Sequence, residues 1–262
     1  MAANLFREER LQMIMGMIYE KKKVFVKALA EQFGKSPSSI RLDLSELENR
    51  GLINRTHGGA ILAEAVGSTY VLDKGFLSQR EETAKEEKKR IGKAVIELIS
   101  DGDSIMIDGG STTYYVAQNL HKRRGLTIIT TSYHLLPVLL EIPDAKIYLT
   151  GGLIHRDFKD LIGDIALDAI KRFKPDCAII GIDGMSVRQG LTSTESSMKQ
   201  IKQYIRSVGS KTIVVADSSK IGKVCLNHVL DIMEVYAVVT DTAAPHDFVS
   251  ALNDLDTKLI LA

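Results

Sequence analysis

Apolar residues at helical spacing occupy the first part of the chain. One helix face carries them at the i, i+3, i+4 and i+7 positions Leu11, Ile14, Met15 and Ile18. After a basic turn the pattern resumes over residues 26–33 and stops at Gly34, a residue suited to the left-handed backbone at a helix end. These two stretches predict a pair of short amphipathic helices.

A third helix is predicted directly after this glycine. Ser36 is a suitable N-cap because Pro37 follows it at the first helical position. The buried face of the helix is predicted to consist of Ile40, Leu44 and Leu47. The segment 51–62 then shows two apolar runs around a polar centre that contains glycine, which is typical of a β-hairpin. Three helices followed by a hairpin are the order of a winged helix-turn-helix.

Farther along the chain, seven apolar runs alternate with helix-length amphipathic segments. The runs cover residues 104–108, 126–132, 146–152, 177–183, 212–217, 236–241 and 258–262. The segments between them include residues 88–99, 112–120, 132–141, 165–173 and 195–207. Because the runs are apolar without interruption, we expect a largely parallel sheet with helices on both faces.

The chain is therefore predicted to be α/β overall and to contain two domains. Residues 1–62 would form the winged helix-turn-helix, residues 63–79 a linker without a consistent period, and residues 80–262 the mostly parallel α/β domain. The charge changes at the same place, since residues 1–62 contain ten Lys and Arg against seven Asp and Glu, whereas the remainder contains 24 against 26. A basic N-terminal domain on a slightly acidic body suits a nucleic-acid-binding protein.

The composition argues against several classes of protein. No apolar run approaches the ~20 residues that cross a bilayer, and the charged N-terminus does not resemble a secretory signal. We therefore expect a cytoplasmic protein that does not bind membranes. Cys177 and Cys225 lie outside any CxxC or Cys/His cluster, which favours core thiols over a disulfide framework or a zinc site.

The exposed face of the third helix is predicted to read DNA. Its short polar side chains permit close approach to the major groove, and Arg41 can donate to guanine or phosphate. On the hairpin, Arg55 and His57 would bind backbone phosphates together with the basic turn 21–23. The alternative, that each basic residue is only a solvated surface charge, does not explain their coincidence with the helix order. The predicted DNA contacts are Ser36, Ser38, Ser39, Arg41, Leu42, Ser45, Arg55 and His57.

Polar residues and glycines gather at the predicted strand ends, where open parallel sheets bind ligands. In the segment 108–113, DGGSTT, two glycines allow close approach of the backbone to a ligand and three hydroxyls follow, a pattern typical of a phosphate cradle. Similar residues at other strand ends are Thr131, Ser132, Gly151, Gly152, Asp183, Gly184 and Lys220. The sequence predicts a site for an anionic ligand at this edge, although each glycine could instead be a turn residue.

The run 36–60, SPSSIRLDLSELENRGLINRTHGGA, resembles the signature of the DeoR family of transcription regulators. It contains the family's serine, the central Ile-Arg, Asp-Leu and Leu-Glu, and then Arg-x-His-Gly-Gly-Ala at the family's spacings. Three positions depart from the usual pattern, since Ser39 replaces Thr, Leu42 replaces a second Arg and Phe25 replaces a capping Ser. Leu42 removes an arginine contact and could instead contact a thymine methyl group.

The resemblance implies a C-terminal sensor domain similar in fold to ribose-phosphate isomerases and CoA transferases. It implies a phosphorylated sugar as effector, double-stranded operator DNA as partner, and a homodimer or homotetramer. We expect no cofactor and no metal. The implied effector-binding residues are Asp108, Gly110, Ser111, Thr112, Thr113, Ser132, Gly152, Asp183, Glu195, Lys199 and Lys220. Thr131 stands where the family often has Asn. Arg156 is a further candidate for binding the phosphate. Glu195 and Lys199 could instead be only an i, i+4 pair on a helix.

The sequence leaves two functions open. One is a transcription regulator, most simply a repressor of a carbohydrate uptake or catabolism operon that the effector relieves. The other is a sugar-phosphate isomerase-like or CoA-transferase-like enzyme, in which Asp108, Asp183, Glu195 and Lys199 would form an acid/base set. The helix-turn-helix favours the regulator because metabolite turnover does not require it. Nicotinamide binding is not predicted, since no GxGxxG motif follows a strand.

Overall fold

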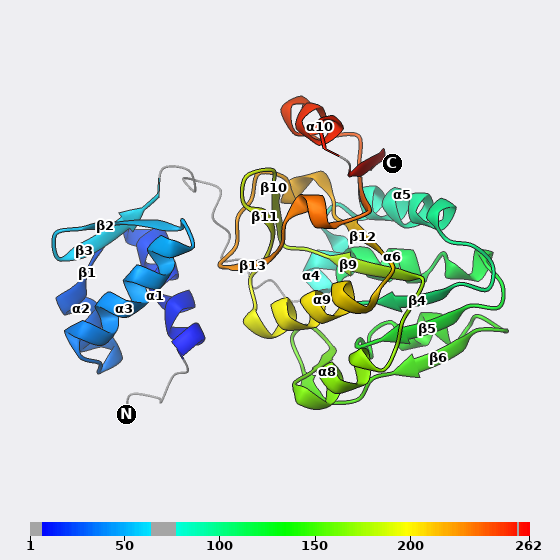
Figure 1. Cartoon of the computed structure of the whole chain (residues 1–262), viewed down its shortest axis with the longest axis horizontal. Helices are drawn as coiled ribbons and strands as arrows, with labels where there is room; N and C mark the ends of the chain where they lie inside the picture. The colour runs from blue at the N-terminus through cyan, green and yellow to red at the C-terminus, as the bar shows by residue number, and fades with distance from the viewer. Residues whose placement is uncertain (1–6, 64–76, 256) are drawn as a thin grey trace. The chain divides into compact units, whose positions relative to one another are not determined.

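A computed structural model describes residues 7–63, 77–255 and 257–262 (Figure 1). Contacts between residues divide the chain into two compact units, residues 1–72 with 224–226 and residues 73–223 with 227–262. Most of the predicted linker, residues 64–76, lies outside the described residues. Helix α4 (Leu77–Glu82) begins within the range 63–79, so regular structure starts earlier than the sequence analysis expects.

The N-terminal unit, where it is described, contains the three predicted helices and a small antiparallel sheet. The helices are α1 (Arg7–Lys21), α2 (Val26–Phe33) and α3 (Pro37–Asn49). The sheet has the order β1–β3–β2, from β1 (Lys23–Phe25), β2 (Ile53–Thr56) and β3 (Gly59–Leu62). The apolar residues predicted for the first and third helices are all completely buried. The hairpin β2–β3 is the predicted wing.

Strand β1 was not expected, because three residues after a run of lysines carry no readable period. It pairs with β3, where Phe25 lies opposite Gly59. A Cβ at Gly59 would overlap the carbonyl oxygen of Val24, so this pairing requires glycine. Gly59, the second glycine of the wing, therefore has a packing role that its sequence pattern does not reveal.

The helix ends in this unit follow the predicted chemistry. Gly34 ends α2 in the left-handed conformation with φ 59°, and Ser36 Oγ accepts a hydrogen bond from the N–H of Ser39 at 3.2 Å. Phe25 precedes α2 and supplies no side-chain cap, which agrees with its departure from the capping serine. The turn between α2 and α3 is thus fixed at both ends by local sequence.

A seven-stranded parallel sheet forms the centre of the C-terminal unit. Its order is β15–β14–β12–β9–β4–β5–β6, and every neighbouring pair is parallel. The strands are β4 (Ser104–Ile107), β5 (Thr127–Thr130), β6 (Lys146–Leu149), β9 (Cys177–Gly181), β12 (Lys211–Val215), β14 (Ala237–Thr240) and β15 (Lys258–Leu261). All seven correspond to the predicted runs, so the predicted α/β class is confirmed.

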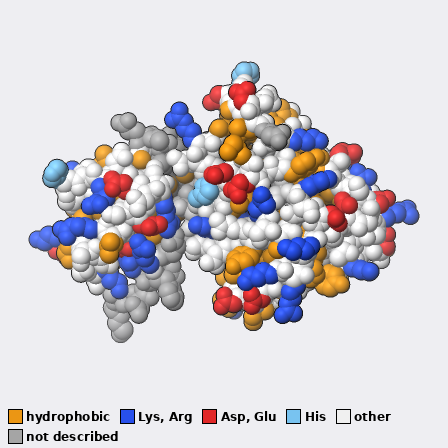
Figure 2. Space-filling model, viewed as in Figure 1, with side chains coloured by type: hydrophobic (Ala, Val, Ile, Leu, Met, Phe, Trp, Pro, Cys, Tyr) orange, Lys and Arg blue, Asp and Glu red, His pale blue; other side chains and the backbone are white. Residues whose placement is uncertain are grey.

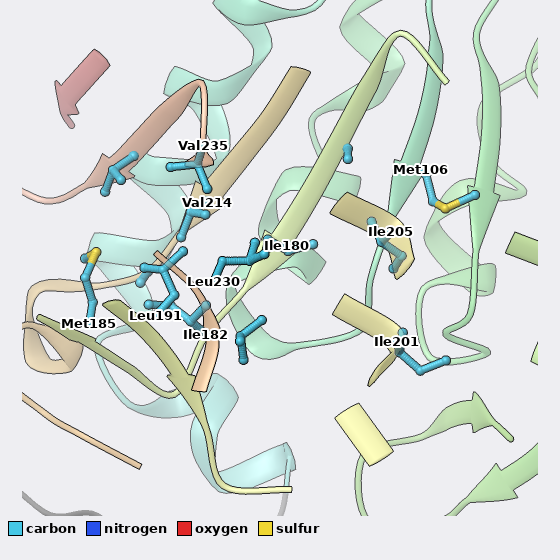
Figure 3. Packing of buried hydrophobic residues seen from close by; sticks show 14 of the residues in the cluster. Met106, Ile180, Ile182, Met185, Leu191, Ile201, Ile205, Val214, Leu230 and Val235 are labelled. Carbon is cyan, nitrogen blue, oxygen red and sulfur yellow. The ribbon is translucent and has the colours of Figure 1, made fainter. Parts of the chain in front are cut away.

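Successive strand residues alternate between two buried layers. In β9, Ala178 and Ile180 belong to one layer, whereas Cys177 and Ile179 belong to the other. Helices α8 (Asp164–Lys171), α9 (Ser196–Val208) and α10 (His246–Asn253) pack in the first layer. Helices α5 (Lys85–Val95), α6 (Ser111–Ala117) and α7 (Leu136–Leu139) pack in the second. Figure 3 shows residues of the first layer, among them Ile201 and Ile205 of α9 and Met106 of the sheet.

Some elements differ from the prediction. The segment 132–141 is helical only at Leu136–Leu139, because Pro137 lacks an N–H and fits only the first helical turn. A hairpin, β7 (Leu153–His155) with β8 (Asp160–Ile162), was not predicted. Nor was a second sheet made of β10 (Gly184–Ser186), β11 (Gly190–Ser193) and β13 (Asn227–Leu230). These segments lack the longer apolar runs that mark the seven strands of the large sheet.

Three simpler expectations can be compared with the described part of the chain. None of its helices has the length and apolar character needed to span a membrane. None of its His, Cys, Asp and Glu side chains form a group of three or more suited to a metal ion. Cys177 and Cys225 are both buried, and burial raises the pKa of the Cys177 thiol to about 12, as expected for a core thiol.

Candidate functional site

The first candidate site is the outer face of α3 in the N-terminal unit. Of the residues predicted on this helix and its cap, Ser36, Ser38, Arg41 and Leu42 are exposed, while Ser39 and Ser45 are half-buried. Leu42 exposes 67% of its surface although it is a large apolar residue. The opposite helix face is buried, so this row of side chains is available to a groove. Figure 2 shows Lys and Arg side chains distributed over the visible face of this unit.

The wing is tied to the same helix face. Arg55 Nη1 donates to Ser45 Oγ at 2.7 Å, and the backbone N–H of Arg55 donates to Glu48 Oε1 at 2.9 Å. His57 lies exposed in the turn between β2 and β3. The structure therefore brings Arg55 and Ser45 together, and a phosphate contact by Arg55 would compete with its bond to Ser45.

A buried ion pair joins α1 to α3, and the sequence analysis missed it. Asp43 is 1% exposed and accepts from Arg10 Nε at 2.6 Å and from Arg10 Nη2 at 3.1 Å. Arg7 Nε adds a third bond at 3.3 Å. Asp43 falls between Ile40 and Leu44 on the helix, so a carboxylate on the apolar face was the available signal. The bidentate pair fixes the orientation of the helix that carries Arg41.

The second candidate site lies at the point where the strand order of the large sheet reverses. From β4 the chain proceeds outward to β5 and β6, and then returns to β9 on the opposite side of β4. Such a switch point leaves a crevice beyond the carboxyl ends of the two strands, where open α/β sheets bind ligands. A hollow lies there and is lined by Arg80, Gly109, Gly110, Ser111, Thr112, Phe158, Gly181, Ile182, Asp183, Ser193, Met198, Lys202 and Lys220.

An ion pair between Arg80 and Asp183 forms one wall of the hollow. Arg80 Nη2 donates to Asp183 Oδ1, and both side chains are largely buried. The other oxygen, Oδ2, accepts from Ser193 Oγ at 2.9 Å and from the N–H of Thr194 at 3.0 Å. Although burial acts to raise it, the Arg80 and Lys202 charges and the Thr194 N–H hold the pKa of Asp183 well below its usual value. Asp183 is thus ionised at neutral pH.

A second pair lies at the base of the hollow. Lys202 Nζ donates to Asp108 Oδ2, and the N–H of Gly181 donates to Asp108 Oδ1 at 3.0 Å. Asp108 is completely buried, and burial raises the pKa of its carboxyl group against the opposing charge of Lys202. Lys202 lines the hollow, whereas Asp108 does not. Asp108 therefore fixes the lysine from behind.

A third carboxyl group, Asp160, packs against the glycine loop. A Cβ at Gly109 would overlap both carboxylate oxygens of Asp160, so the first of the two loop glycines is required for this packing. Thr131 Oγ1 donates to Oδ1 at 3.5 Å, while Oδ2 is buried without a hydrogen bond. Burial, together with the nearby Asp108, raises the pKa of Asp160 to about 7.

The predicted effector residues divide according to the strand order. Gly110, Ser111, Thr112, Asp183 and Lys220 line the hollow, with Asp108 behind it. They follow β4, β9 and β12, which are adjacent in the centre of the sheet. Thr113 lies behind the loop, where its Oγ1 donates to the carbonyl of Gly110 at 3.0 Å.

The remaining predicted residues do not line the hollow. Ser132 Oγ donates to the carbonyl of Lys159 at 3.2 Å, and Gly152 packs so closely on Ile162 that a Cβ would lie 2.7 Å from its carbonyl oxygen. Both follow β5 or β6, the strands farther from the switch point. Glu195 and Lys199 are joined by a backbone hydrogen bond of 3.0 Å at the start of α9 and also lie outside the lining. Arg156 is exposed and does not line it either.

Two cationic residues of this site, Arg80 and Lys202, were not predicted, and only Lys202 lies in a sequence pattern that indicates a buried charge. Lys202 falls on the buried face of α9, which also contains Met198, Ile201 and Ile205. A lysine at an apolar position of a helical pattern indicates a buried charge that requires a partner. Arg80 gave no signal, because α4 is too short for a period and was assigned in part to the linker.

Comparison with protein families assigns both units. The family described as "DeoR C terminal sensor domain" matches residues 83–242, and the one described as "DeoR-like helix-turn-helix domain" matches residues 10–66. The chain belongs to the DeoR family. The helix-turn-helix assignment makes it a DNA-binding transcription regulator, so the alternative of an isomerase-like or transferase-like enzyme is not supported.

DeoR-family relatives align along nearly the whole chain. The glycerol-3-phosphate regulon repressor of Escherichia coli K12 is 32% identical, over 95% of this chain and 96% of the relative. The HTH-type transcriptional regulator GlpR of Haloferax volcanii is also 32% identical, over 89% of each chain. The HTH-type transcriptional repressor GlcR of Bacillus subtilis is 28% identical, over 98% of this chain and 97% of the relative.

Similarity of this DeoR-family chain to solved structures is more distant. A D-ribose-5-phosphate isomerase in complex with phospho-erythronic acid is 22% identical, with a TM-score of 0.40, over 52% of this chain and 54% of the isomerase. The full-length sorbitol operon regulator SorC of Klebsiella pneumoniae is 13% identical, with a TM-score of 0.37, over 83% of this chain and 91% of SorC. These values are too low to bear on function.

Proposed function

We propose that the protein represses genes for carbohydrate uptake or catabolism, and that a phosphorylated sugar relieves repression by binding in the hollow at the switch point. The observation that carries this proposal is the combination of charges in the hollow. Three residues of its lining, Arg80, Lys202 and Lys220, have cationic side chains and one, Asp183, has a carboxylate, while Asp108 and Asp160 lie behind the lining. The excess of positive charge in the lining favours an anionic ligand.

The other groups of the hollow suit the neutral part of such a ligand. Ser111, Thr112 and Ser193 bring hydroxyl groups that can donate to or accept from sugar hydroxyls. Gly109 and Gly110 leave the loop backbone accessible to a phosphate group. The name of one relative, the glycerol-3-phosphate regulon repressor, is consistent with a phosphorylated ligand.

On the DNA side, we propose that α3 of two copies reads the two halves of an operator. Helix-turn-helix proteins bind half-sites about one DNA turn apart as dimers, because a single recognition helix contacts only a few base pairs. We therefore propose a homodimer or a homotetramer. Mass measurement of the purified chain, alone and with DNA selected from a random pool, tests this assembly. A monomer in both samples would contradict it.

The ligand is tested by thermal unfolding of the full-length chain. The probes are glycerol 3-phosphate, ribose 5-phosphate and glucose 6-phosphate, each paired with its unphosphorylated counterpart. A ligand at 100 times its Kd stabilises the folded state by about 2.7 kcal/mol, so binding raises the unfolding temperature. At least one phosphorylated probe is expected to do so and to release selected DNA. If each phosphorylated probe and its unphosphorylated counterpart change the unfolding temperature equally, the ligand is not recognised through its phosphate.

A matched pair of lysine variants locates the response. Lys220 lines the hollow, and burial together with Arg80 lowers the pKa of its ammonium group. Lys146 is an exposed residue of β6, the edge strand of the sheet. Lys220→Met is expected to weaken binding of the phosphorylated probe about tenfold, since a charge-assisted hydrogen bond is lost. Lys146→Met is the control and is expected to bind like the natural chain.

A further inference from the structure

A small helix beside the hollow is attached to the rest of the C-terminal unit mainly through polar side chains. Helix α4 (Leu77–Glu82) contributes Arg80 to the lining. Leu77 is buried, but polar contacts also join α4 to Asp183, Lys88, Tyr115, Lys85 and His134. An element held in this way can shift when the charge of one partner changes.

Lys88 holds the end of α4 in place. Its Nζ donates to the carbonyl oxygen of Arg80 and, at 2.6 Å, to that of Thr83. The side chain is 2% exposed and lies 3.7 Å from Asp217 Oδ2. Burial lowers the pKa of Lys88 more than the Asp217 carboxylate raises it, so this pKa is lowered to about 8. A buried cation on two carbonyls makes Lys88 a positioning residue for α4, not a ligand-binding one.

The connection between α4 and α5 carries backbone strain. Ala84 joins the two helices with φ 51°, in the left-handed region that costs a non-glycine residue about 1 kcal/mol. Such a residue is a natural hinge, since the strain is relieved when the segment moves. Lys88 lies one turn beyond Ala84 and bonds to the carbonyls on the other side of it.

Asp183 can release Arg80 without becoming unpaired. Its Oδ2 keeps three hydrogen bonds, from Ser193 Oγ, the Thr194 N–H and Thr194 Oγ1. Only Oδ1 faces the arginine. A phosphate group in the hollow offers Arg80 more oxygens and more negative charge than this shared carboxylate does. Lys202, by contrast, is fixed by the buried carboxylate of Asp108.

We infer that Arg80 recognises the anionic group of the effector by leaving its ion pair with Asp183 and binding that group instead. This exchange moves α4 about the Ala84 hinge. The inference rests on the proposed ligand site and adds how occupancy of that site is sensed. Helix α4 is the first described segment of the C-terminal unit after residues 64–76, which connect it in sequence to the DNA-binding unit.

Hydrogen–deuterium exchange of the full-length chain tests the inference. The probes are inorganic phosphate and the three sugar phosphates named above, and the amides of interest lie in residues 77–84. In the natural chain, the phosphorylated probe that raises the unfolding temperature is expected to change their exchange, while its unphosphorylated counterpart leaves them unchanged. Unchanged exchange in the presence of a bound probe would overturn the inference and leave the proposed ligand site standing.

Variants of Arg80 distinguish a loss of anion recognition from a general effect on folding. Arg80→Gln removes the charge, and a loss of about ten- to hundredfold in probe affinity is expected, together with loss of probe-induced DNA release. Arg80→Lys keeps the charge without the planar fork and is expected to lie between Arg80→Gln and the natural chain. Arg188→Gln, an exposed arginine in the turn between β10 and β11, is the control.

The outcomes distinguish this inference from the proposal beneath it. If Arg80→Gln, or Arg80→Lys where the first variant does not fold, binds the probe as tightly as the natural chain, Arg80 does not read the anion. If no phosphorylated probe stabilises the natural chain, the proposed function fails, and the role of Arg80 fails with it. Probe binding without any change in residues 77–84 rejects the inference alone.

Discussion

Charged side chains at otherwise apolar positions carry much of the chemistry of this protein. Lys88 and Lys202 each fall on the buried face of a helix, and each meets oxygen atoms there instead of water. Asp43 does the same on α3. A buried charge is expensive unless it is paired, so each of these residues marks a place where two elements are held at a fixed distance.

At the residue scale, the two arginines of the N-terminal unit are expected to differ in their effect on DNA binding. Arg41→Ala should weaken binding to the selected DNA and relax its specificity through loss of about 1–3 kcal/mol of base discrimination. Arg55→Ala should weaken binding to all sequences and lower the salt slope by about 1, because it removes a phosphate contact. Binding of selected and scrambled DNA at several salt concentrations distinguishes them. Identical behaviour of the two variants would refute this division.

Asp160 predicts an unusual dependence of stability on pH. Its pKa is about 7 in the folded chain against an ordinary value of 3.8, so the folded state binds the extra proton between these values. Stability is therefore retained below about pH 4 and lost as pH rises towards 7, by about 4 kcal/mol at most for this group. Asp160→Asn should remove that loss. Urea unfolding at pH 4.5 and 7.5 measures it.

The test compares the free energy of unfolding of the natural chain with that of Asp160→Asn at each pH, because other groups titrate in both proteins. The natural chain and Asp160→Asn should differ most at pH 7.5 and least at pH 4.5. Asp168→Asn, in an exposed position of α8 with an exposed partner, is the control. Parallel profiles for the natural chain and Asp160→Asn would show that the carboxyl group titrates normally.

At the element scale, the two units are built on different principles. The sheet of the C-terminal unit requires only that each strand be apolar on both faces, because successive side chains point alternately into two apolar layers. The helices of the N-terminal unit are short, so their angles depend on specific contacts. The bidentate Arg10–Asp43 pair is one such contact, and it joins the first helix to the recognition helix.

Removal of Asp43 is expected to destabilise the N-terminal unit. Asp43→Ala leaves Arg10 buried without its carboxylate, a change that typically costs about 3–5 kcal/mol. Amide exchange in α1 and α3 of the full-length chain measures the opening free energy of this unit separately. Glu31→Ala, at an exposed position of α2, is the control and should change it by less than about 0.5 kcal/mol. Equal exchange in both variants would mean that the pair is dispensable.

At the scale of the whole molecule, the order of the strands determines which loops meet. The loops after β4, β9 and β12 meet because these strands are neighbours in the centre of the sheet, although they are far apart in sequence. The lining also includes Arg80 of α4, so it combines residues from 80 to 220. Its response must reach the N-terminal unit, residues 1–72 with 224–226, which α4 follows along the chain.

Asp108 offers a test of communication between the two units. Asp108→Asn keeps the shape of the side chain but removes the charge that fixes Lys202. The variant is expected to bind selected DNA like the natural chain and to require at least about tenfold more sugar phosphate to release it. Titration of the protein–DNA complex with glycerol 3-phosphate, ribose 5-phosphate and glucose 6-phosphate measures this. A normal response would exclude Asp108 from the effector site.

The sequence by itself determined the elements that depend on neighbouring residues. Helical spacing, the Ser36–Pro37 start and Gly34 predict the helix-turn-helix, and apolar runs predict the seven strands. These features arise from steric preference, capping and alternation, which act over a few residues. Short strands such as β1 and β7 escaped prediction because pairing with a distant partner, and not local preference, stabilises them.

Only the tertiary structure decided which strand ends share a site and which charges oppose one another. Ser132 and Gly152 looked equivalent to Asp183 in sequence, yet they follow strands farther from the switch point and take part in packing. Arg80 stood at the start of the predicted α/β domain without any pattern to mark it, yet it pairs with Asp183. Strand order and ion pairing depend on contacts between residues about 100 positions apart, which no local pattern encodes.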